Sequence, residues 1–386
     1  MSKFLFHNEN EQLDVTSDQL KDNKFKQMKK YILLACIALS FLSCKNEPKQ
    51  ETSDNVSSNK HIRHVHDTIG FAKYAWQMES IYSRLGIADK ENDLQWKVAI
   101  SPHDDYKYAG RLYYESLKGI NANTVILVGV AHRARNYSLQ DKIIFGSYTH
   151  WESPYGDLKV SDLNSEIMNN LKDDAYVVHD SMQNLEHSLE AIVPFLHKKN
   201  PELEIIPILV PYINYETIDA ISTQLSKAVL KVLKKHNLNY GEDVAIVISN
   251  DAVHYGNEEW SGDLAPFGVD DEGTEKAREM DLEIINNCLT NDITEAKIKR
   301  FTEYTVQQDD YKEYKWVWCG RYSVPFGLDF ANKLNILTNN KPLTGTFMHY
   351  QSSIDHELID VEDLGMGTTA IATQRHWVAY ASLKYE

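Results

Sequence analysis

Four short apolar runs set the strongest limit on how this chain can fold. They cover residues 97–101, 124–130, 204–210 and 243–249, and they are apolar at successive rather than alternate positions. Such runs are typical of strands that are buried on both faces, as in a parallel sheet. Segments between them, such as 218–235, carry apolar residues at helical spacing. The sequence therefore predicts a layered α/β/α domain with a mainly parallel central sheet.

The charge balance limits the class of ligand. The chain has 386 residues, with 40 Lys and Arg against 56 Asp and Glu, so its formal net charge is −16. An acidic surface repels the phosphate backbone, so we expect no nucleic-acid partner and instead a small-molecule or peptide ligand, or a metal ion. The four cysteines are too few and too widely separated for a disulfide framework.

The N-terminal part predicts a membrane anchor rather than a domain. Two lysines after Met28 precede an apolar run at 31–43, which ends at Cys44. The run is shorter than the roughly 20 apolar residues that span a bilayer, and it has the proportions of a signal peptide. Residues 41–44 resemble a bacterial lipobox, so we interpret 28–44 as a lipoprotein signal peptide. The alternative is a buried apolar helix.

This interpretation divides the chain into four parts. Residues 1–27 are polar and do not suit the front of a signal, so we expect the true start at Met28 and a mis-assigned leader before it. Residues 45–66 have the composition of a flexible tether, and residues 67–386 form one domain. The expected location is the bacterial cell envelope, on the periplasmic or outer-membrane side, with membrane contact only through a lipid on Cys44.

Histidines follow three of the predicted strands. His103 comes after 97–101, His132 after 124–130, and Asp251 and His254 after 243–249. Ligands of open α/β sheets bind outside the carboxyl ends of the strands, so these side chains are expected to converge. Two neutral imidazoles with an anionic third ligand suit a divalent transition metal. Asp251 and His254 would complete the metal site or act in acid–base catalysis, although Asp251 is also a candidate helix N-cap.

Two further residues are site candidates with alternatives. His187 falls in a predicted amphipathic helix at 185–197, as either a donor lining a pocket or an ordinary surface histidine. Cys319 precedes a predicted helix at 324–334, where the helix N-terminus and Arg321 would stabilise a thiolate. The alternative for Cys319 is a packed free cysteine, which is our interpretation of Cys288.

Six ordered blocks give the chain a resemblance to a known family. Between about residues 95 and 383 it looks like the MEMO family, called AmmeMemoRadiSam system protein B in bacteria. The blocks are 101–106 (SPHDDY), 129–132 (GVAH), 151–156 (WESPYG), 186–190 (EHSLE), 249–256 (SNDAVHYG) and 319–321 (CGR).

The resemblance implies a fold and a metal site. The family is similar in fold to class III extradiol dioxygenases, which hold non-haem Fe(II). By this resemblance His103, His132 and Cys319 fall at metal-binding positions, and His254 takes the place of the acid–base histidine with Asp251 beside it. The implied cofactor is Fe(II), with copper or zinc as alternatives.

Three functions follow as hypotheses. The first is a dioxygenase-type oxidoreductase that acts on a small aromatic or related substrate, with His254, Asp251 and His187 as catalytic residues. The second is a non-catalytic metal-binding or redox protein, because a thiolate ligand favours copper(I) or zinc. The third is a peptide- or ligand-binding module built on four aromatic residues, Trp316, Trp318, Tyr255 and Tyr350. The sequence has no motif of the common hydrolases.

Overall fold

The computed structural model describes residues 60–87, 94–258, 264–355 and 358–386. The predicted leader at 1–27, the signal peptide at 28–44 and residues 45–59 of the predicted tether lie outside the described residues. Within the described part, no helix combines the length and the apolar character needed to cross a membrane.

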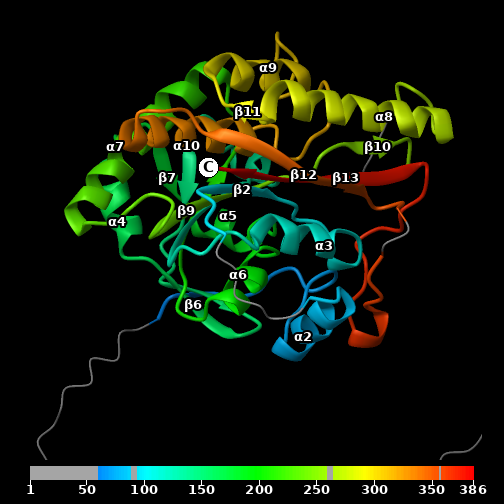
Figure 1. The fold of residues 1–386 in the computed structure, drawn as a ribbon, viewed down its shortest axis with the longest axis horizontal. Coiled ribbons are helices and arrows are strands. Elements are labelled where there is room, and N and C mark those ends of the chain that lie inside the picture. Colours follow the sequence, from blue (N-terminus) through cyan, green and yellow to red (C-terminus); the bar gives the residue numbers. More distant parts are fainter. Residues whose placement is uncertain (1–59, 88–93, 259–263, 356–357) are drawn as a thin grey trace, which may run out of the picture. The chain divides into compact units, whose positions relative to one another are not determined.

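One large sheet runs through the molecule (Figure 1). Its strands follow the order β1-β5-β6-β8-β3-β9-β2-β13-β12-β11. In addition, β10 pairs with β13, and β4 pairs with both β7 and β8. The bounds are β1 Ile62–Arg63, β2 Val98–Ser101, β3 Thr124–Val130, β4 Ile143–Phe145, β5 His150–Ser153, β6 Gly156–Val160, β7 Tyr176–Val178, β8 Glu204–Val210, β9 Val244–Ser249, β10 His254–Gly256, β11 Asn291–Asp292, β12 Thr344–Ser352 and β13 His376–Tyr385.

The four predicted strands form the centre of this sheet. They are β2, β3, β8 and β9, and the neighbouring pairs β8–β3, β3–β9 and β9–β2 are all parallel. Beside β2, the chain adds β13, which is antiparallel to β2, and then β12, which is antiparallel to β13. The prediction of a mainly parallel central sheet is confirmed. Antiparallel pairs lie at both sides of the central strands, β5 with β6 at one side and β13 with β2 and β12 at the other.

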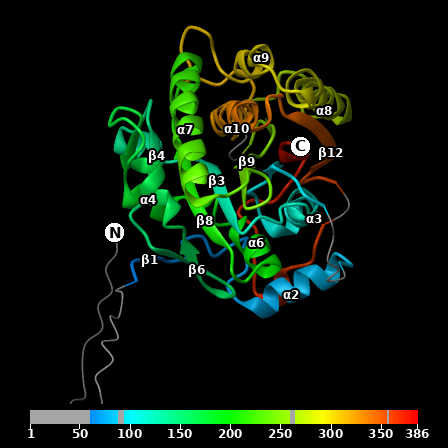
Figure 2. The same cartoon turned by 60° about the vertical axis from the view of Figure 1, so that its left-hand side comes forward.

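Helices cover both faces of the sheet (Figure 2). Along β2, Val98 and Ile100 join one hydrophobic core, which contains residues of α7, α8, α9 and α10. Ala99 faces the other core, which contains residues of α2, α3 and α6. The layered α/β/α prediction is therefore confirmed. The helix bounds are α2 Ala75–Arg84, α3 Tyr106–Leu117, α4 Leu163–Met168, α5 Asp180–Leu185, α6 Val193–Lys199, α7 Tyr215–His236, α8 Asp271–Ile284 with a π-helical turn at Ile285–Leu289, α9 Glu295–Thr305 and α10 Ser323–Asn339; short 3-10 turns lie at Ala134–Tyr137 and Glu362–Leu364.

Local signals explain where these helices begin and end. The predicted helix at 218–235 is α7, which starts where Asn214 Oδ1 accepts the Thr217 amide at 2.8 Å. It ends at Asn237, whose φ of 54° is left-handed. The prediction of one helix over 185–197 is wrong: α5 ends at Leu185, residues 186–187 are irregular, and residues 188–192 form turns before α6. Pro194 suits only a first helical turn, and α6 begins at Val193.

The folded unit begins before the predicted boundary at residue 67. Strand β1 pairs in parallel with β5, and the Arg63 side chain is fully buried. Its guanidinium donates to the Glu190 carboxylate and to the carbonyl of Glu186. A tether that reaches residue 66 is therefore too long.

Candidate metal centre

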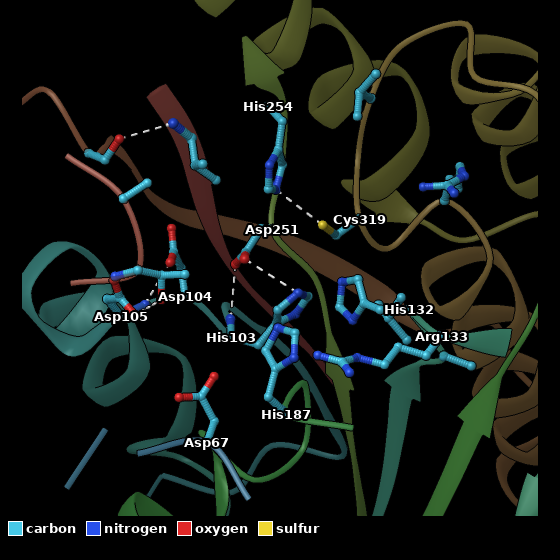
Figure 3. A pocket seen from close by; sticks show the side chains of 18 of the residues that line it. Asp67, His103, Asp104, Asp105, His132, Arg133, His187, Asp251, His254 and Cys319 are labelled. Carbon is cyan, nitrogen blue, oxygen red and sulfur yellow. Dashed lines mark hydrogen bonds and ion pairs between the residues drawn. The ribbon is translucent and has the colours of Figure 1, made fainter. Parts of the chain in front are cut away.

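Side chains from the carboxyl ends of β2, β3 and β9 meet at one edge of the sheet. They line a cavity of about 490 Å³ that includes His103, His132, Asp251, His254 and Cys319. These strands are adjacent and parallel, so the segments that follow them leave the sheet at the same edge. Figure 3 shows the labelled side chains gathered around this cavity.

Three potential ligand atoms lie close together. His103, His132 and Cys319 each offer one atom, and all three atoms lie within 4.8 Å of one another. In a tetrahedral site with bonds of about 2.0–2.3 Å, ligand atoms lie roughly 3.3–3.8 Å apart. Small side-chain movements would therefore let the two imidazoles and the thiolate hold a metal ion.

The hydrogen bonds of His103 leave one ring nitrogen available. Its Nδ1 lies 2.8 Å from the Ser249 hydroxyl, which itself donates to the carbonyl of Ser188 at 2.7 Å. The hydroxyl must therefore accept a proton from Nδ1, so the lone pair available for a metal is that of Nε2. This Nε2 is buried and makes no hydrogen bond among the described residues, and Asp251 Oδ2 lies 3.4 Å from it.

His132 is oriented in the same way by a buried carboxylate. Glu186 Oε1 lies 2.8 Å from His132 Nδ1, and Oε2 accepts the His132 amide at 2.8 Å. A carboxylate only accepts, so Nδ1 donates and Nε2 faces the cavity, where a metal ion would take the place of the Nε2 proton. Burial by itself raises the pKa of Glu186 and lowers that of His132. The attraction between the two groups outweighs burial, so the pKa of Glu186 is held low and that of His132 well above its usual value.

Cys319 lies in an environment that favours its thiolate. Its Sγ is 3.1 Å from His254 Nε2. Burial by itself raises the pKa of the thiol, but the surrounding imidazoles, that of His254 above all, hold the pKa well below its usual value. The site therefore contains a sulfur in its metal-binding form at neutral pH.

The segment after β9 fixes the position of Cys319. The carbonyl of Asp251 accepts the Cys319 amide at 3.0 Å, and Asn250 Oδ1 accepts the Gly320 amide at 3.0 Å. The His254 amide donates to the carbonyl of Val317 at 2.9 Å. A Cβ atom at Gly320 would collide with the Asn250 side chain, so this close approach requires glycine.

Asp251 acts within the site rather than as a helix cap. Its Oδ1 accepts the His103 amide at 2.9 Å, and β10 rather than a helix follows it. The N-cap alternative is therefore wrong. Burial raises the pKa of Asp251 to about 7, although the His103 ring beside it acts in the opposite direction. One carboxylate oxygen of Asp251 also lies within 4.8 Å of ligand atoms of His254 and Cys319, so these three residues form a second group that could hold a metal ion.

His187 reaches the cavity from the turn between α5 and α6. Its ring stacks on that of His132, with centroids 4.6 Å apart, and lies 5.7 Å from that of His103. Burial and the His132 charge lower the pKa of His187 to about 3, so it is neutral at neutral pH. The sequence left two alternatives for His187, a residue that lines a pocket or an ordinary surface histidine. In the structure His187 lines the cavity.

Two cysteines and four aromatic residues that the sequence analysis singled out lie in different environments. Cys319 lines the cavity, which excludes the packed alternative, whereas Cys288 is fully buried and packed as predicted. The aromatic set proposed for a binding module does not line the cavity: the Trp316 and Trp318 indoles and the Tyr350 hydroxyl donate to the carboxylate of Asp281.

Three supporting residues were not predicted as members of the site. Glu186 and Ser249 each stood in a matched block without a role, and Asp281 lay in no block. A polar residue at the last position of an apolar strand is a usable signal for Ser249. No local pattern distinguishes Asp281 from the other acidic residues of α8.

The fold and the site define a class of protein. It is a layered α/β protein with a His, His and Cys cluster at the carboxyl edge of its parallel strands, able to hold a metal ion. A family model described as "Memo-like protein" matches residues 72–370. The chain therefore belongs to the Memo-like family, which confirms the resemblance seen in the sequence.

Curated relatives carry the same family name. A MEMO1 family protein of Pyrococcus furiosus is 24% identical over 227 residues, which cover 58% of this chain and 73% of that protein. One from Pyrococcus abyssi is 23% identical over 283 residues, covering 72% and 87%. One from Thermotoga maritima is 27% identical over 161 residues, covering 40% and 53%.

Proposed function

We propose that this protein is a metal-dependent, dioxygenase-type oxidoreductase that acts on a small aromatic or related molecule. Its metal, Fe(II) in this proposal, is held by His103, His132 and Cys319. The observation that carries the proposal is the joint orientation of the two imidazoles: the Nδ1 of each is bonded to an acceptor, which leaves both Nε2 atoms beside the same thiolate.

The residues around the ligands have separate tasks. Fe(II) with three protein ligands would supply open coordination positions for a substrate and O2. Burial lowers the pKa of His254, but the Cys319 thiolate more than compensates and raises it to about 9. The His254 ring is therefore protonated at neutral pH, and it can deliver a proton to a bound molecule. Asp251 holds the backbone of His103 and faces the same space.

The cavity suits a small organic molecule. Its volume of about 490 Å³ falls in the usual range for ligand pockets. Ile69, Phe71 and Val378 give it apolar wall area, and His187 contributes a neutral ring that can donate or accept a hydrogen bond. These groups favour a partly apolar substrate with polar groups at the metal.

The test of the proposal has two parts. Protein purified without oxygen is analysed for metal content beside the variants His103→Ala and Cys319→Ser, with the partly buried His150→Ala of β5 and the packed Cys288→Ser as matched controls. We expect wild type and controls to carry about one metal ion and the site variants to carry little. Oxygen uptake by Fe(II)-loaded protein is then measured with a panel of catechols. Equal metal content in all proteins would exclude the site, and no uptake would exclude the activity.

A second candidate is a metal-binding or redox protein without turnover. The Cys319 thiolate favours it, because sulfur ligands select copper(I) or zinc over Fe(II). Competitive titration of reduced protein with copper(I), zinc and Fe(II) separates the two. Preference for copper(I) or zinc by several orders of magnitude, together with no oxygen uptake, would support this candidate.

We also propose that the chain is held at a bacterial envelope membrane by a lipid on Cys44. The support is the sequence of 28–44 alone. Expression in a bacterial host with a labelled fatty acid, beside Cys44→Ala, tests it: label in wild type and none in the variant is the expected result. Peptide mass spectrometry would contradict a start at Met28 if it detected any peptide from residues 1–27.

A further inference from the structure

Arg321 is a buried guanidinium close to the metal centre. The residue is 7% exposed, lines the cavity and lies two positions after Cys319. Its guanidinium carbon is 3.9 Å from the ring centroid of Tyr314 and 4.8 Å from that of Tyr322. These contacts fix the faces of the guanidinium, so its N–H groups point outward in its own plane.

No carboxylate of the described residues forms an ion pair with Arg321. Its Nη1 donates to the carbonyl of Trp318 at 3.2 Å, and its Nε is buried without a hydrogen-bond partner. By contrast, Arg63, the other buried arginine among the described residues, pairs with the Glu190 carboxylate. A buried charge is costly unless it is paired. The charge of Arg321 is therefore left for a group that enters from outside the chain.

Arg321 lies on the Cys319 side of the cavity, because it donates to the carbonyl of Trp318, the residue before Cys319. Arg133 adds positive charge on this side, beside His132 (Figure 3). The helix α10 begins at Ser323, and its N-terminal end carries partial positive charge. The other side holds three carboxylates, those of Asp67, Asp104 and Asp105 (Figure 3). The metal centre lies between these two sides.

We propose that the cavity binds a small organic monoanion, an aryl or alkyl carboxylate, with its carboxylate on Arg321. This inference rests on the proposed function in one respect: the ligand occupies the cavity that contains the metal centre. A planar guanidinium recognises a carboxylate through directed, charge-assisted hydrogen bonds. The apolar wall accommodates the body of the ligand, and the three opposing carboxylates disfavour a second negative charge.

The polarity of the cavity also orients the ligand. A carboxylate on Arg321 is held away from the acidic side, and the remainder of the molecule then extends past the metal ligands towards Asp104. The Asp104 carboxylate accepts from Tyr380 and from the Asp105 amide, so it is held in place as an acceptor. A hydroxyl or amine at the far end of the ligand would match it.

Benzoate is the probe, with benzamide as its neutral counterpart and phenyl phosphate as the dianion. Each is titrated calorimetrically into zinc-loaded and chelator-treated protein. We expect benzoate to bind wild type and benzamide to bind at least about tenfold more weakly. Arg321→Met should weaken benzoate by about 30-fold or more without lowering the melting temperature, since an unpaired buried charge is replaced by an apolar chain.

Two substitutions are matched controls. Arg135 also lies over a tyrosine ring, that of Tyr212, but it is exposed and pairs with Glu313, so Arg135→Met should leave benzoate binding unchanged. Lys299 lines the adjoining cavity of about 290 Å³, which Arg321 also borders. Lys299→Met should have no effect, and an effect equal to that of Arg321→Met would place the anion in the adjoining cavity and overturn the proposal.

The remaining outcomes separate this inference from the proposed function. Equal benzoate affinity in wild type and Arg321→Met, or tighter binding of phenyl phosphate than of benzoate, would overturn the inference. Loss of benzoate binding in His103→Ala with retention in Arg321→Met would assign the carboxylate to the metal instead. If wild type binds benzoate but no metal, and Arg321→Met binds neither, the inference stands and the metal function fails.

Discussion

At the scale of single residues, the site depends on groups that direct its histidines. Ser249 and Glu186 each accept the Nδ1 proton of one histidine, and each is buried. Neither residue is one of the three proposed ligands. They determine which nitrogen of each ring faces the cavity, and this decides whether the rings can bind a metal at all.

Glu186→Gln should weaken metal binding by about 10- to 100-fold. The glutamine has one acceptor oxygen where the carboxylate has two, and these two receive the His132 ring, the His132 amide and the Ser188 amide. Zinc titration against a chromophoric chelator measures the change.

A surface pair provides the control for this substitution. Glu152 also bonds a histidine Nδ1, that of His64, but its side chain is 46% exposed and remote from the cluster. Glu152→Gln should therefore leave zinc affinity unchanged. Unaltered affinity in Glu186→Gln would show that His132 is oriented without the carboxylate.

At the scale of elements, one aspartate of α8 joins three segments around the site. Asp281 accepts the indole N–H groups of Trp316 and Trp318 at 2.7 and 2.6 Å, the Tyr350 hydroxyl at 2.9 Å and the Val253 amide at 3.3 Å. Val253 precedes His254, and Trp318 precedes Cys319. The helix thus holds both segments that meet in the His254–Cys319 contact.

Asp281→Ala should lower the free energy of unfolding by about 3–5 kcal/mol, because four buried donors lose their acceptor. Urea unfolding measures this change. Glu279→Ala, on the exposed side of the same helix, should change it by less than about 0.5 kcal/mol. A similar small effect of Asp281→Ala would show that the indoles find other acceptors.

Asp281 should also make stability depend on pH. Burial raises its pKa in the folded protein from 3.8 to about 6, against the opposing effect of its donors. The folded state therefore holds this proton more tightly than the unfolded state does. Its contribution to stability is full below pH 4 and is lost as the pH rises through about 6.

Urea unfolding between pH 4 and 8 checks this expectation. The difference in unfolding free energy between wild type and Asp281→Asn isolates the contribution of the carboxyl, because asparagine does not titrate. As the pH rises, the unfolding free energy of wild type should fall relative to that of Asp281→Asn. A difference that stays constant across the range would mean that the pKa of Asp281 is not raised.

At the scale of the whole molecule, the proposed ligands connect distant parts of the chain. His103 follows β2, His132 follows β3, and Cys319 precedes α10. An ion bound only by the folded state stabilises it by about 2.7 kcal/mol at a concentration 100 times its dissociation constant. Chelator treatment of metal-loaded protein should therefore lower its melting temperature by several degrees, and zinc should restore it.

Cys319→Ser provides the comparison for this experiment. Serine is a poor ligand for the same ion, so the variant should melt at one temperature with or without zinc. The Cys288→Ser variant should respond to zinc as wild type does, because Cys288 is packed in the core. A zinc response of equal size in Cys319→Ser would place the ion elsewhere.

The sequence by itself determined the central strands, the two-sided burial and the convergence of His103, His132 and Asp251. These follow from local rules: continuous apolar runs become buried strands, and parallel strands bring the residues after them to one edge. The position of Cys319 came from family resemblance, since it follows no strand of the central set.

Only the tertiary structure decided the rest. It placed His187 in the connection between α5 and α6 rather than in a helix, and it gathered Trp316, Trp318 and Tyr350 around Asp281. It also left Arg321 without an anionic partner among the described residues. Each of these depends on contacts between residues far apart in the chain, such as Asp281 with Trp318 or Glu186 with His132. Patterns of spacing report the face of an element on which a side chain lies, whereas its partner is set by the packing of elements against one another.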